Sequence, residues 1–339
     1  MAEITKVKET TPQGTVLLTG ANGSLGLSLV QQLLEQYPSY SAILTVRDIS
    51  DRDPNTEALR KLLSRFPAAK ATIEVLDLAS LSNVRAFAED VASRVSTGKI
   101  PPIAAIVCNA FSWSLVGMKH SSDDYELGFQ VSHLSHFVLV LKLLDAMNKS
   151  TGRIVLLGSV KHDGAERFGA KFPDDLEKVI KPPSDKPGEE FAQGFQRYAN
   201  SKLANVMFML TLNKRLAKDP SLQGITAVAV NPGDMPTSRA FQHVPFAFGM
   251  VLKIAAFLLP LFQYFTSLTS TKSAAINLVA MSVGPEASGS RGYFEGQKPV
   301  QSSKDSQDEG WRERVWKVCE KWSGLKQSET VLNIGEGEY

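Results

Sequence analysis

The chain has little cysteine. Its 339 residues include 2 cysteines, Cys108 and Cys319, which are too few for a disulfide framework or for a metal site of their own. The 5 histidines show no zinc-ligand spacing that cysteines or paired carboxylates complete. The sequence therefore predicts a protein without a metal ion, in a reducing compartment such as the cytoplasm.

An excess of charge of one sign is also missing. The 37 basic and 35 acidic residues leave a net charge of +2, and the basic residues are scattered rather than clustered with aromatic ones. We therefore expect no nucleic-acid partner. Residues 1–9 carry charges and no apolar core, so no secretory signal is expected there.

One long apolar run interrupts this pattern, at residues 244–265. It approaches the roughly 20 residues that cross a membrane, but Lys253 lies near its centre and two prolines and a glycine break it. Five phenylalanines, including Phe257 and Phe262, favour a lid over an apolar substrate that also touches a membrane surface. The alternatives are a membrane anchor, a core helix pair and a dimer contact.

Short apolar runs alternate with amphipathic stretches along the chain. Continuous runs of Val, Ile and Leu separated by helices are typical of a parallel sheet covered on both faces. The sequence therefore predicts an α/β fold, a doubly wound sheet of about seven strands. The expected strands lie at 15–19, 42–46, 71–76, 103–108, 153–157, 226–230 and 291–294. The expected helices include 24–36, 81–95, 123–147 and 271–281.

No linker is clean enough to divide the chain, so residues 14–324 are expected to form a single domain. Residues 163–196, rich in proline, glycine and charge, read as an insertion at the rim of the sheet, and 240–268 as the substrate lid. Residues 1–13 and 325–339 are expected to be flexible tails. Three tryptophans between positions 311 and 322 favour a final helix packed onto the body.

A glycine-rich turn follows the first expected strand and opens the first expected helix. In that context the glycines let the backbone approach a pyrophosphate and present amide hydrogens to it. The alternative is a tight strand–helix turn without a ligand. The predicted contacts to a dinucleotide in this turn are Thr19, Gly20, Asn22, Gly23, Ser24, Leu25 and Gly26.

Two further positions bear on the choice of nucleotide. Arg47 ends the second strand, where an arginine accommodates the 2′-phosphate of NADP, whereas the adjacent Asp48 would neutralise it and favour NAD. Asp77 and Leu78 follow the third strand and are placed to contact the adenine. The alternative for Asp77 is a charge at the start of the next helix.

Tyr198-Ala-Asn-Ser-Lys202 carries the chemistry. Tyr198 and Lys202 lie four residues apart, on one face of a helix. An ammonium group there is expected to lower the pKa of the phenol from about 10 towards the working pH, as a general acid for a carbonyl oxygen requires. With the upstream glycine turn, the pair predicts hydride transfer; the alternative is an ordinary helix face.

With these motifs in this order, the chain resembles the short-chain dehydrogenase/reductase family, nearest to its retinol-dehydrogenase-like and protochlorophyllide-reductase-like members. The resemblance implies a Rossmann-like single domain and a catalytic set of Ser159, Tyr198 and Lys202, with Tyr198 and Lys202 also against the cofactor. It implies cofactor contacts from Asn109, Pro232, Gly233 and Thr237, and a homodimer paired through the long helices unless the final helix covers them. The similar stretches are Thr19–Gly26, Asp77–Arg85, Cys108–Ala110, Val131–Phe137, Arg153–Ser159, Tyr198–Val206 and Asn231–Thr237.

Three positions depart from the family pattern. Gly23 stands one position earlier than the usual middle glycine of the turn. Phe111 replaces the glycine of an Asn-Ala-Gly motif, so we expect its ring to shape the substrate pocket. Ser132 replaces an asparagine of the proton relay to the lysine, and its hydroxyl either holds the relay water or leaves the relay slow.

These observations predict an NADPH-dependent reductase of a ketone or aldehyde in a large apolar small molecule of secondary metabolism. The substrate classes left open are polyketide, terpenoid, steroid and retinoid. Two alternatives also stay open: an NADP-sensing binding protein without catalysis, and a dehydrogenase that oxidises an alcohol.

Overall fold

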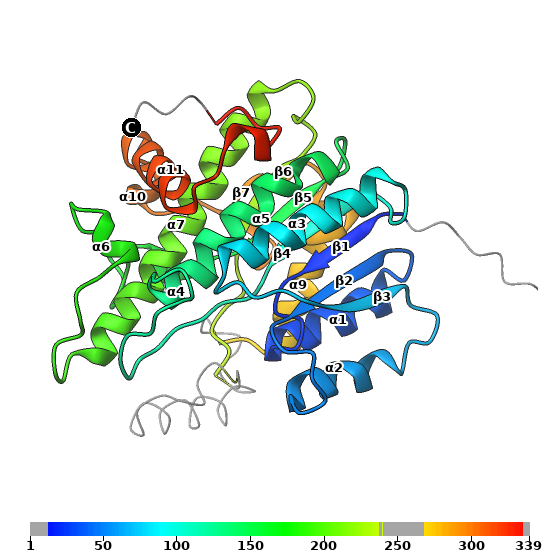
Figure 1. Cartoon of the computed structure of the whole chain (residues 1–339), viewed down its shortest axis with the longest axis horizontal. Coiled ribbons are helices and arrows are strands. Elements are labelled where there is room, and N and C mark those ends of the chain that lie inside the picture. Colours follow the sequence, from blue (N-terminus) through cyan, green and yellow to red (C-terminus); the bar gives the residue numbers. More distant parts are fainter. Residues whose placement is uncertain (1–12, 237–238, 240–267, 335–339) are drawn as a thin grey trace, which may run out of the picture.

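A computed structural model describes residues 13–236, 239 and 268–334 of the chain. One eight-stranded sheet runs through them in the order β3-β2-β1-β4-β5-β6-β7-β8 (Figure 1). Neighbouring strands are parallel from β3 to β7, and β8 pairs antiparallel to β7. The strands are β1 (Thr15–Leu18), β2 (Ser41–Val46), β3 (Ala71–Val75), β4 (Ile103–Cys108), β5 (Arg153–Leu157), β6 (Thr226–Asn231), β7 (Gly292–Glu295) and β8 (Lys298–Val300). The predicted doubly wound α/β sheet is confirmed, with one strand more than expected.

Helices cover both faces of the sheet. On one face α1 packs against α9, and on the other lie α3, α5 and α7 (Figure 1). The helices are α1 (Ser24–Gln36), α2 (Pro54–Leu63), α3 (Leu81–Ser96), α4 (Leu127–Phe129), α5 (Ser135–Leu143), α6 (Glu177–Ile180), α7 (Glu190–Lys218), α9 (Thr271–Val283), α10 (Lys304–Gln307) and α11 (Glu309–Ser323). In β1 the side chain of Leu17 belongs to one core and those of Val16 and Leu18 to the other, as the alternation of a strand requires.

The long helix expected at 123–147 begins only at Leu127 and is not α-helical throughout. A π-helical segment, η1 (Gln130–Leu134), joins α4 to α5. Such single-turn π segments are frequent at functional sites. In the predicted rim insertion, α6 forms and α7 begins at Glu190, so this part of the chain is more regular than the sequence suggested.

The expected final helix packed onto the body is confirmed as α11, whereas the expected C-terminal tail is not. Helix α11 packs on α7 and α5, with the Trp316 ring 5.6 Å from that of Phe208, so it covers helix surface that a dimer was expected to use. Residues 325–334 are not a tail, because Leu325 and Leu332 are buried and Glu329 pairs with Arg85 and Lys142. The apolar residues here are too widely spaced to show a helix or strand period, which is why the sequence pattern failed.

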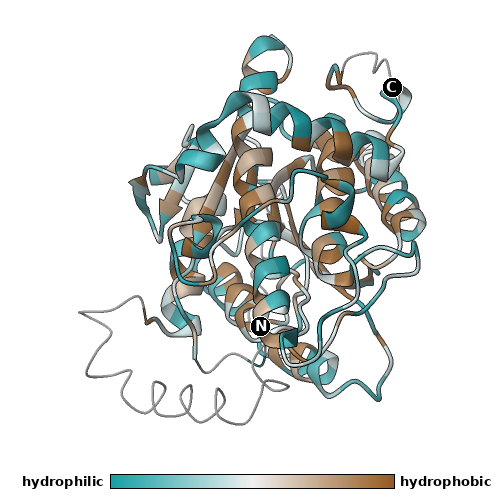
Figure 2. Ribbon diagram, turned by 90° about the vertical axis from the view of Figure 1, so that its left-hand side faces the viewer, coloured by the Kyte–Doolittle hydropathy of each residue, from teal (hydrophilic) through white to brown (hydrophobic). Residues whose placement is uncertain are grey.

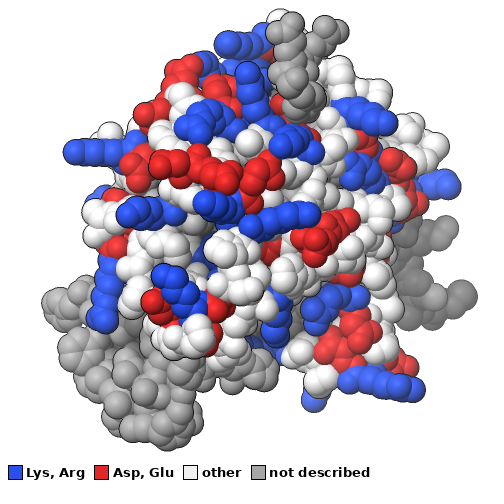
Figure 3. Space-filling view, turned by 60° about the vertical axis from the view of Figure 1, so that its left-hand side comes forward, with Lys and Arg blue, Asp and Glu red and all other residues white. Residues whose placement is uncertain are grey.

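Apolar residues concentrate on the strands and on the inner sides of the helices (Figure 2). Among the described residues, one helical stretch, Leu127–Ala146, is long and apolar enough to cross a membrane, but 83% of its apolar window is buried in the protein. Charges of both signs intermingle over the face in Figure 3. The expected lid at 240–268, with Phe257 and Phe262, lies outside the described residues except for Leu268.

Candidate active site

Several residues that the sequence singles out gather at one edge of the sheet, because they follow the carboxyl ends of parallel strands. The glycine turn follows β1, Asn109 follows β4, Ser159 follows β5 and Pro232 follows β6. Strand order reverses between β1 and β4, since β1 continues to β2 on one side while β4 begins the other half of the sheet. Ligands of open α/β sheets bind in the crevice at such a reversal.

The glycine turn is built for close approach to its backbone. Gly20 has φ +66°, and a Cβ on Gly26 would lie 2.3 Å from the Gly20 carbonyl oxygen. Gly23, at the N-cap of α1, provides no side chain to cap the helix, and the first turn holds no acidic residue. The first amides of α1 therefore face an open cradle, which is the donor set that the pyrophosphate of a dinucleotide requires.

Two of the predicted cofactor contacts brace this turn. Thr19 is fully buried, and its hydroxyl bonds His136 Nε2 at 2.9 Å and accepts from the Ala110 amide at 3.0 Å. Its side chain therefore faces the core, so the cofactor contact predicted for Thr19 could come only from its backbone. Asn109 donates through Nδ2 to the carbonyls of Thr19 at 2.9 Å and Gly20 at 3.1 Å, and so ties β4 to the turn.

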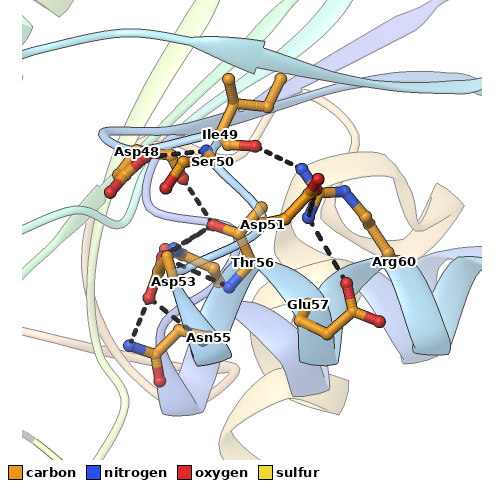
Figure 4. Close-up of polar contacts among 10 residues, drawn as sticks. Asp48, Ile49, Ser50, Asp51, Asp53, Asn55, Thr56, Glu57 and Arg60 are labelled. Atoms are coloured by element: carbon orange, nitrogen blue, oxygen red, sulfur yellow. Dashed lines mark hydrogen bonds and ion pairs between the residues drawn. The ribbon is translucent and has the colours of Figure 1, made fainter.

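The loop after β2 holds its own acidic residues in place. Asp48 accepts from the Ser50 amide at 2.8 Å, and that hydrogen bond is the main reason why the pKa of Asp48 is lowered (Figure 4). Asp53 caps α2 and also accepts from Asn22 Nδ2 of the glycine turn at 3.0 Å. Arg47 is exposed, and no ion pair among the described residues includes it. The Asp48 carboxylate is therefore bound within its own loop while the Arg47 guanidinium is left facing solvent.

The segment after β3 shows a structural role. The carboxylate of Asp77 accepts from the Ala79 amide at 2.9 Å, within the turn that leads to α3. The Leu78 side chain is buried in the core, and its carbonyl accepts from Ser135 Oγ at 2.6 Å. For Asp77 these contacts favour the alternative interpretation, a group that shapes the start of the helix.

Ser159, Tyr198 and Lys202 come together at the end of β5. Tyr198 and Lys202 share one face of α7, and the Lys202 ammonium lies 5.4 Å from the centre of the Tyr198 ring. Lys202 is buried and donates through Nζ to the Leu157 carbonyl at 3.0 Å. The Ser159 side chain hydrogen-bonds Tyr198. The spacing read from the sequence therefore produces the expected cluster.

The electrostatics of the pair differ from the expectation. Burial raises the pKa of Tyr198 to about 12, and the hydrogen bond with Ser159 only partly opposes that effect. Burial also lowers the pKa of Lys202 to about 8. The expected lowering of the tyrosine pKa is therefore not found, because desolvation of the phenolate dominates and the charge of Asp234 acts in the same direction. At neutral pH the phenol keeps its proton and the ammonium stays charged.

Ser132 does not reach Lys202 with its hydroxyl. Its Oγ donates to the Ser112 carbonyl and accepts from the Ser112 amide, both at 3.3 Å. Its backbone carbonyl, in η1, accepts from Asn205 Nδ2 at 3.2 Å. The Ser132 hydroxyl therefore anchors the loop after β4, and the Ser132 carbonyl is hydrogen-bonded by Asn205 of α7. Asn205 was missed, although it stands three residues after Lys202, on the same side of the helix.

Aromatic rings surround the tyrosine. The ring of Phe111 lies 6.2 Å from that of Tyr198, as the sequence predicted for a residue near the reacting groups, and is 40% exposed. Two rings were missed, Trp113 at 5.2 Å and Phe195 at 6.2 Å from Tyr198. Phe195 stands three residues before Tyr198 on α7, a signal that the sequence does contain.

The loop after β6 also lies at this edge. Gly233 has φ +86°, and its amide donates to Asn231 Oδ1 at 3.1 Å. Pro232 is half-buried between them, whereas Thr237 lies outside the described residues. Further along the segment, Arg239 contacts the glycine turn.

Comparisons with known proteins agree with this geometry. The model of the short-chain dehydrogenases matches residues 14–169, and that of the AcuH dehydrogenase domain matches 240–332. The short-chain dehydrogenase iccH of Talaromyces variabilis is 30% identical over 371 aligned positions, which span 96% of this chain and 99% of that protein. The chain belongs to the short-chain dehydrogenase/reductase family.

Two further comparisons are more distant. Protochlorophyllide reductase A of Oryza sativa subsp. japonica is 27% identical over 341 positions, covering 94% of this chain and 82% of that protein. The NADPH-bound carbonyl reductase from chicken fatty liver superposes with a TM-score of 0.55 at 17% identity, over 86% of this chain and 95% of that one. The second likeness shows the shared fold.

Proposed function

We propose that this oxidoreductase is an NADPH-dependent reductase of a ketone or aldehyde in a large apolar small molecule. The observation that carries the proposal is the cluster of Ser159, Tyr198 and Lys202 at the strand edge that also holds the uncapped glycine turn. NADP is supported by Arg47, which the loop leaves without a described ion pair, and by the NADPH named for the chicken carbonyl reductase.

The protein side chains then hold the carbonyl and move one proton. When bound, the reduced nicotinamide supplies the hydride. The Ser159 hydroxyl orients the carbonyl oxygen, and the Tyr198 phenol donates its proton to that oxygen. Lys202, charged at neutral pH, stabilises the phenolate left behind.

The raised pKa of Tyr198 bears on whether the enzyme reduces a carbonyl or oxidises an alcohol. Reduction needs a protonated phenol, whereas oxidation of an alcohol needs a phenolate that accepts the alcohol proton. Because burial raises the pKa of Tyr198 to about 12, the protonated form dominates at neutral pH. This supports reduction over the oxidative alternative.

The surroundings of Tyr198 support an apolar substrate. A carbonyl that reaches the phenol passes Phe111, Trp113 and Phe195, whose rings all lie within 6.2 Å of the tyrosine ring. Aromatic side chains of this size contribute large apolar contact areas. The phenylalanine-rich composition of 244–265 supports the same class of substrate.

The test is consumption of NADPH by the purified protein with a panel of large apolar ketones and aldehydes, beside the variant Tyr198→Phe. We expect the wild type to reduce at least one substrate class and the variant to lose turnover by about 10²–10⁴-fold or more, while it still binds NADPH. A protein that binds NADPH but reduces no carbonyl in either form would support the non-catalytic sensor instead.

A further inference from the structure

Arg239 joins the segment after β6 to the start of α1. Its backbone amide and its Nε both donate to Ser24 Oγ, at 3.0 Å and 3.1 Å. Its guanidinium also donates to the backbone carbonyl of Asn22. Arg239 therefore contacts the first residue of α1, Ser24, although it lies 215 residues further along the chain.

A cation is electrostatically misplaced there. The N-terminus of a helix carries the positive end of the macrodipole and repels cations. No ion pair among the described residues includes Arg239, and its partners are a hydroxyl and a carbonyl, both neutral. The adjoining residues 240–267 contain no aspartate or glutamate in the sequence. Among the described residues, no carboxylate is bonded to the guanidinium or to the first amides of α1; the Asp53 carboxylate, which accepts from Asn22 Nδ2, caps α2 instead.

We propose that Arg239 is a ligand of the cofactor pyrophosphate, held beside the glycine turn and the start of α1 by its contacts with Asn22 and Ser24. The inference rests on the proposed function, because it takes the anion to be that of a dinucleotide. The planar guanidinium presents a fork of N–H donors that matches two phosphate oxygens, and Ser24 holds that fork beside the uncapped amides of the helix.

This role is distinct from that of Arg47. Arg47 follows β2 and is proposed to meet the 2′-phosphate, which NADP has and NAD lacks. The pyrophosphate is common to both nucleotides. Loss of the Arg239 guanidinium should therefore weaken NADPH and NADH by the same factor, whereas loss of the Arg47 guanidinium should weaken NADPH alone.

The experiment is a set of calorimetric binding titrations of the full chain with NADPH, NADH and adenosine 2′-monophosphate. The last ligand has the 2′-phosphate but no pyrophosphate. We expect Arg239→Ala to weaken both dinucleotides by about 10–100-fold, as for a lost hydrogen bond to a charged group. Binding of adenosine 2′-monophosphate should stay within about two-fold, the scatter of a site that has lost no contact. The affinity of Arg239→Lys for both dinucleotides should lie between those of the wild type and Arg239→Ala, since lysine keeps the charge and loses the fork of N–H donors.

The matched control is Arg291→Ala, at an exposed arginine just before β7 whose guanidinium donates to the Gln223 carbonyl. It should bind all three ligands like the wild type, and equal thermal midpoints would show that each variant is folded. Unchanged dinucleotide binding by Arg239→Ala, or an equal loss of adenosine 2′-monophosphate, would overturn the role of Arg239 alone. A wild type that binds neither dinucleotide would overturn the proposed function and this inference together.

Discussion

The two faces of the sheet are built on different principles. In α1 and α9, which cover one face, the buried polar side chains are Gln32 and Ser282. In η1, α5 and α7, on the other face, they are Gln130, Ser132, His133, Ser135, His136, Asn200, Ser201, Lys202, Asn205, Thr211 and Asn213. The first face is held by apolar burial, and the second combines apolar packing with a buried hydrogen-bond network.

That network connects the reacting lysine to the C-terminal helix. Lys202 Nζ and Asn205 Nδ2 both donate to the Leu157 carbonyl, at 3.0 Å and 3.3 Å. Asn205 Oδ1 meets His133 Nδ1 at 2.9 Å, and His133 Nε2 lies 3.4 Å from Cys319 Sγ in α11. Burial lowers the pKa of His133 to about 4, so the histidine is neutral and Lys202 is the charged member. Polar groups buried in this way specify geometry at a cost in stability.

The largest expected effect comes from removing that charge. We expect Lys202→Met to lower kcat by about 10²-fold or more, because the Tyr198 phenolate then forms without a nearby cation. The same change should raise the free energy of unfolding, because a buried ammonium is replaced by an apolar side chain of similar length. Steady-state kinetics and urea unfolding of one preparation measure both. If Lys202→Met lost both activity and stability, the buried polar groups of the second face would not be a cost in stability, which would contradict the contrast drawn between the two faces.

The pH dependence sharpens this prediction. The pKa of Lys202 is about 8 in the folded protein against an ordinary value of 10.5. Between these values the unfolded chain binds the proton on Lys202 and the folded one does not, so the contribution of Lys202 to wild-type stability rises with pH across this window. The stability gap between Lys202→Met and the wild type should therefore narrow by about 3 kcal/mol from below pH ~8 to above pH ~10.5. A gap that stays constant would mean that the lysine is not desolvated.

A matched pair of substitutions separates the faces next. Leu278→Ala, in α9, removes a fully buried side chain and should cost about 2–5 kcal/mol of stability with kcat unchanged. Asn205→Ala should cost about 1–3 kcal/mol for the groups left unsatisfied, and should also raise the pKa of Lys202, since Leu157 then accepts from the ammonium alone. The measurement is the pH profile of kcat beside denaturant unfolding. Parallel profiles for both variants would contradict a positioning role for Asn205.

The same contrast explains what the sequence could predict. Apolar runs located β1, β2, β4, β5 and β6, which are buried on both faces, and the less buried β3 and β7 were located from shorter apolar stretches. They missed β8, a three-residue edge strand that is too short to show a period and contains Pro299. The proximity of Tyr198 and Lys202 could be predicted because they lie within about one helical turn.

What the sequence could not supply was the balance of long-range effects. The pKa of Tyr198 depends on how completely the surrounding rings desolvate it, and these come from separate segments such as the loop after β4 and α7. The contact of Arg239 with Ser24 joins residues 215 positions apart, which no local pattern encodes. The partners of the Thr19 and Ser132 hydroxyls were equally beyond a local pattern, since they come from other strands and loops.

The smallest expected effect lies at the outer edge of the polar face. Glu329 joins the C-terminal segment to Arg85 of α3 at 3.0 Å and to Lys142 of α5 at 2.9 Å, whereas no described ion pair joins α1 to α9. Burial opposes ionisation of Glu329, but the hydrogen bond from Lys142 and the charge of Arg85 leave its pKa lowered. We expect Glu329→Gln to cost about 1 kcal/mol at neutral pH.

The sign of the pH effect tests this contact. A carboxyl whose pKa is lowered on folding stabilises the protein above its unfolded pKa, and this contribution is lost as pH falls through the folded value. Thermal unfolding of the wild type and Glu329→Gln should therefore differ at neutral pH and converge below pH ~4. A difference in thermal stability that persists in acid would indicate that Glu329 acts through packing. The edge of the polar face would then be stabilised by packing, as the apolar face is.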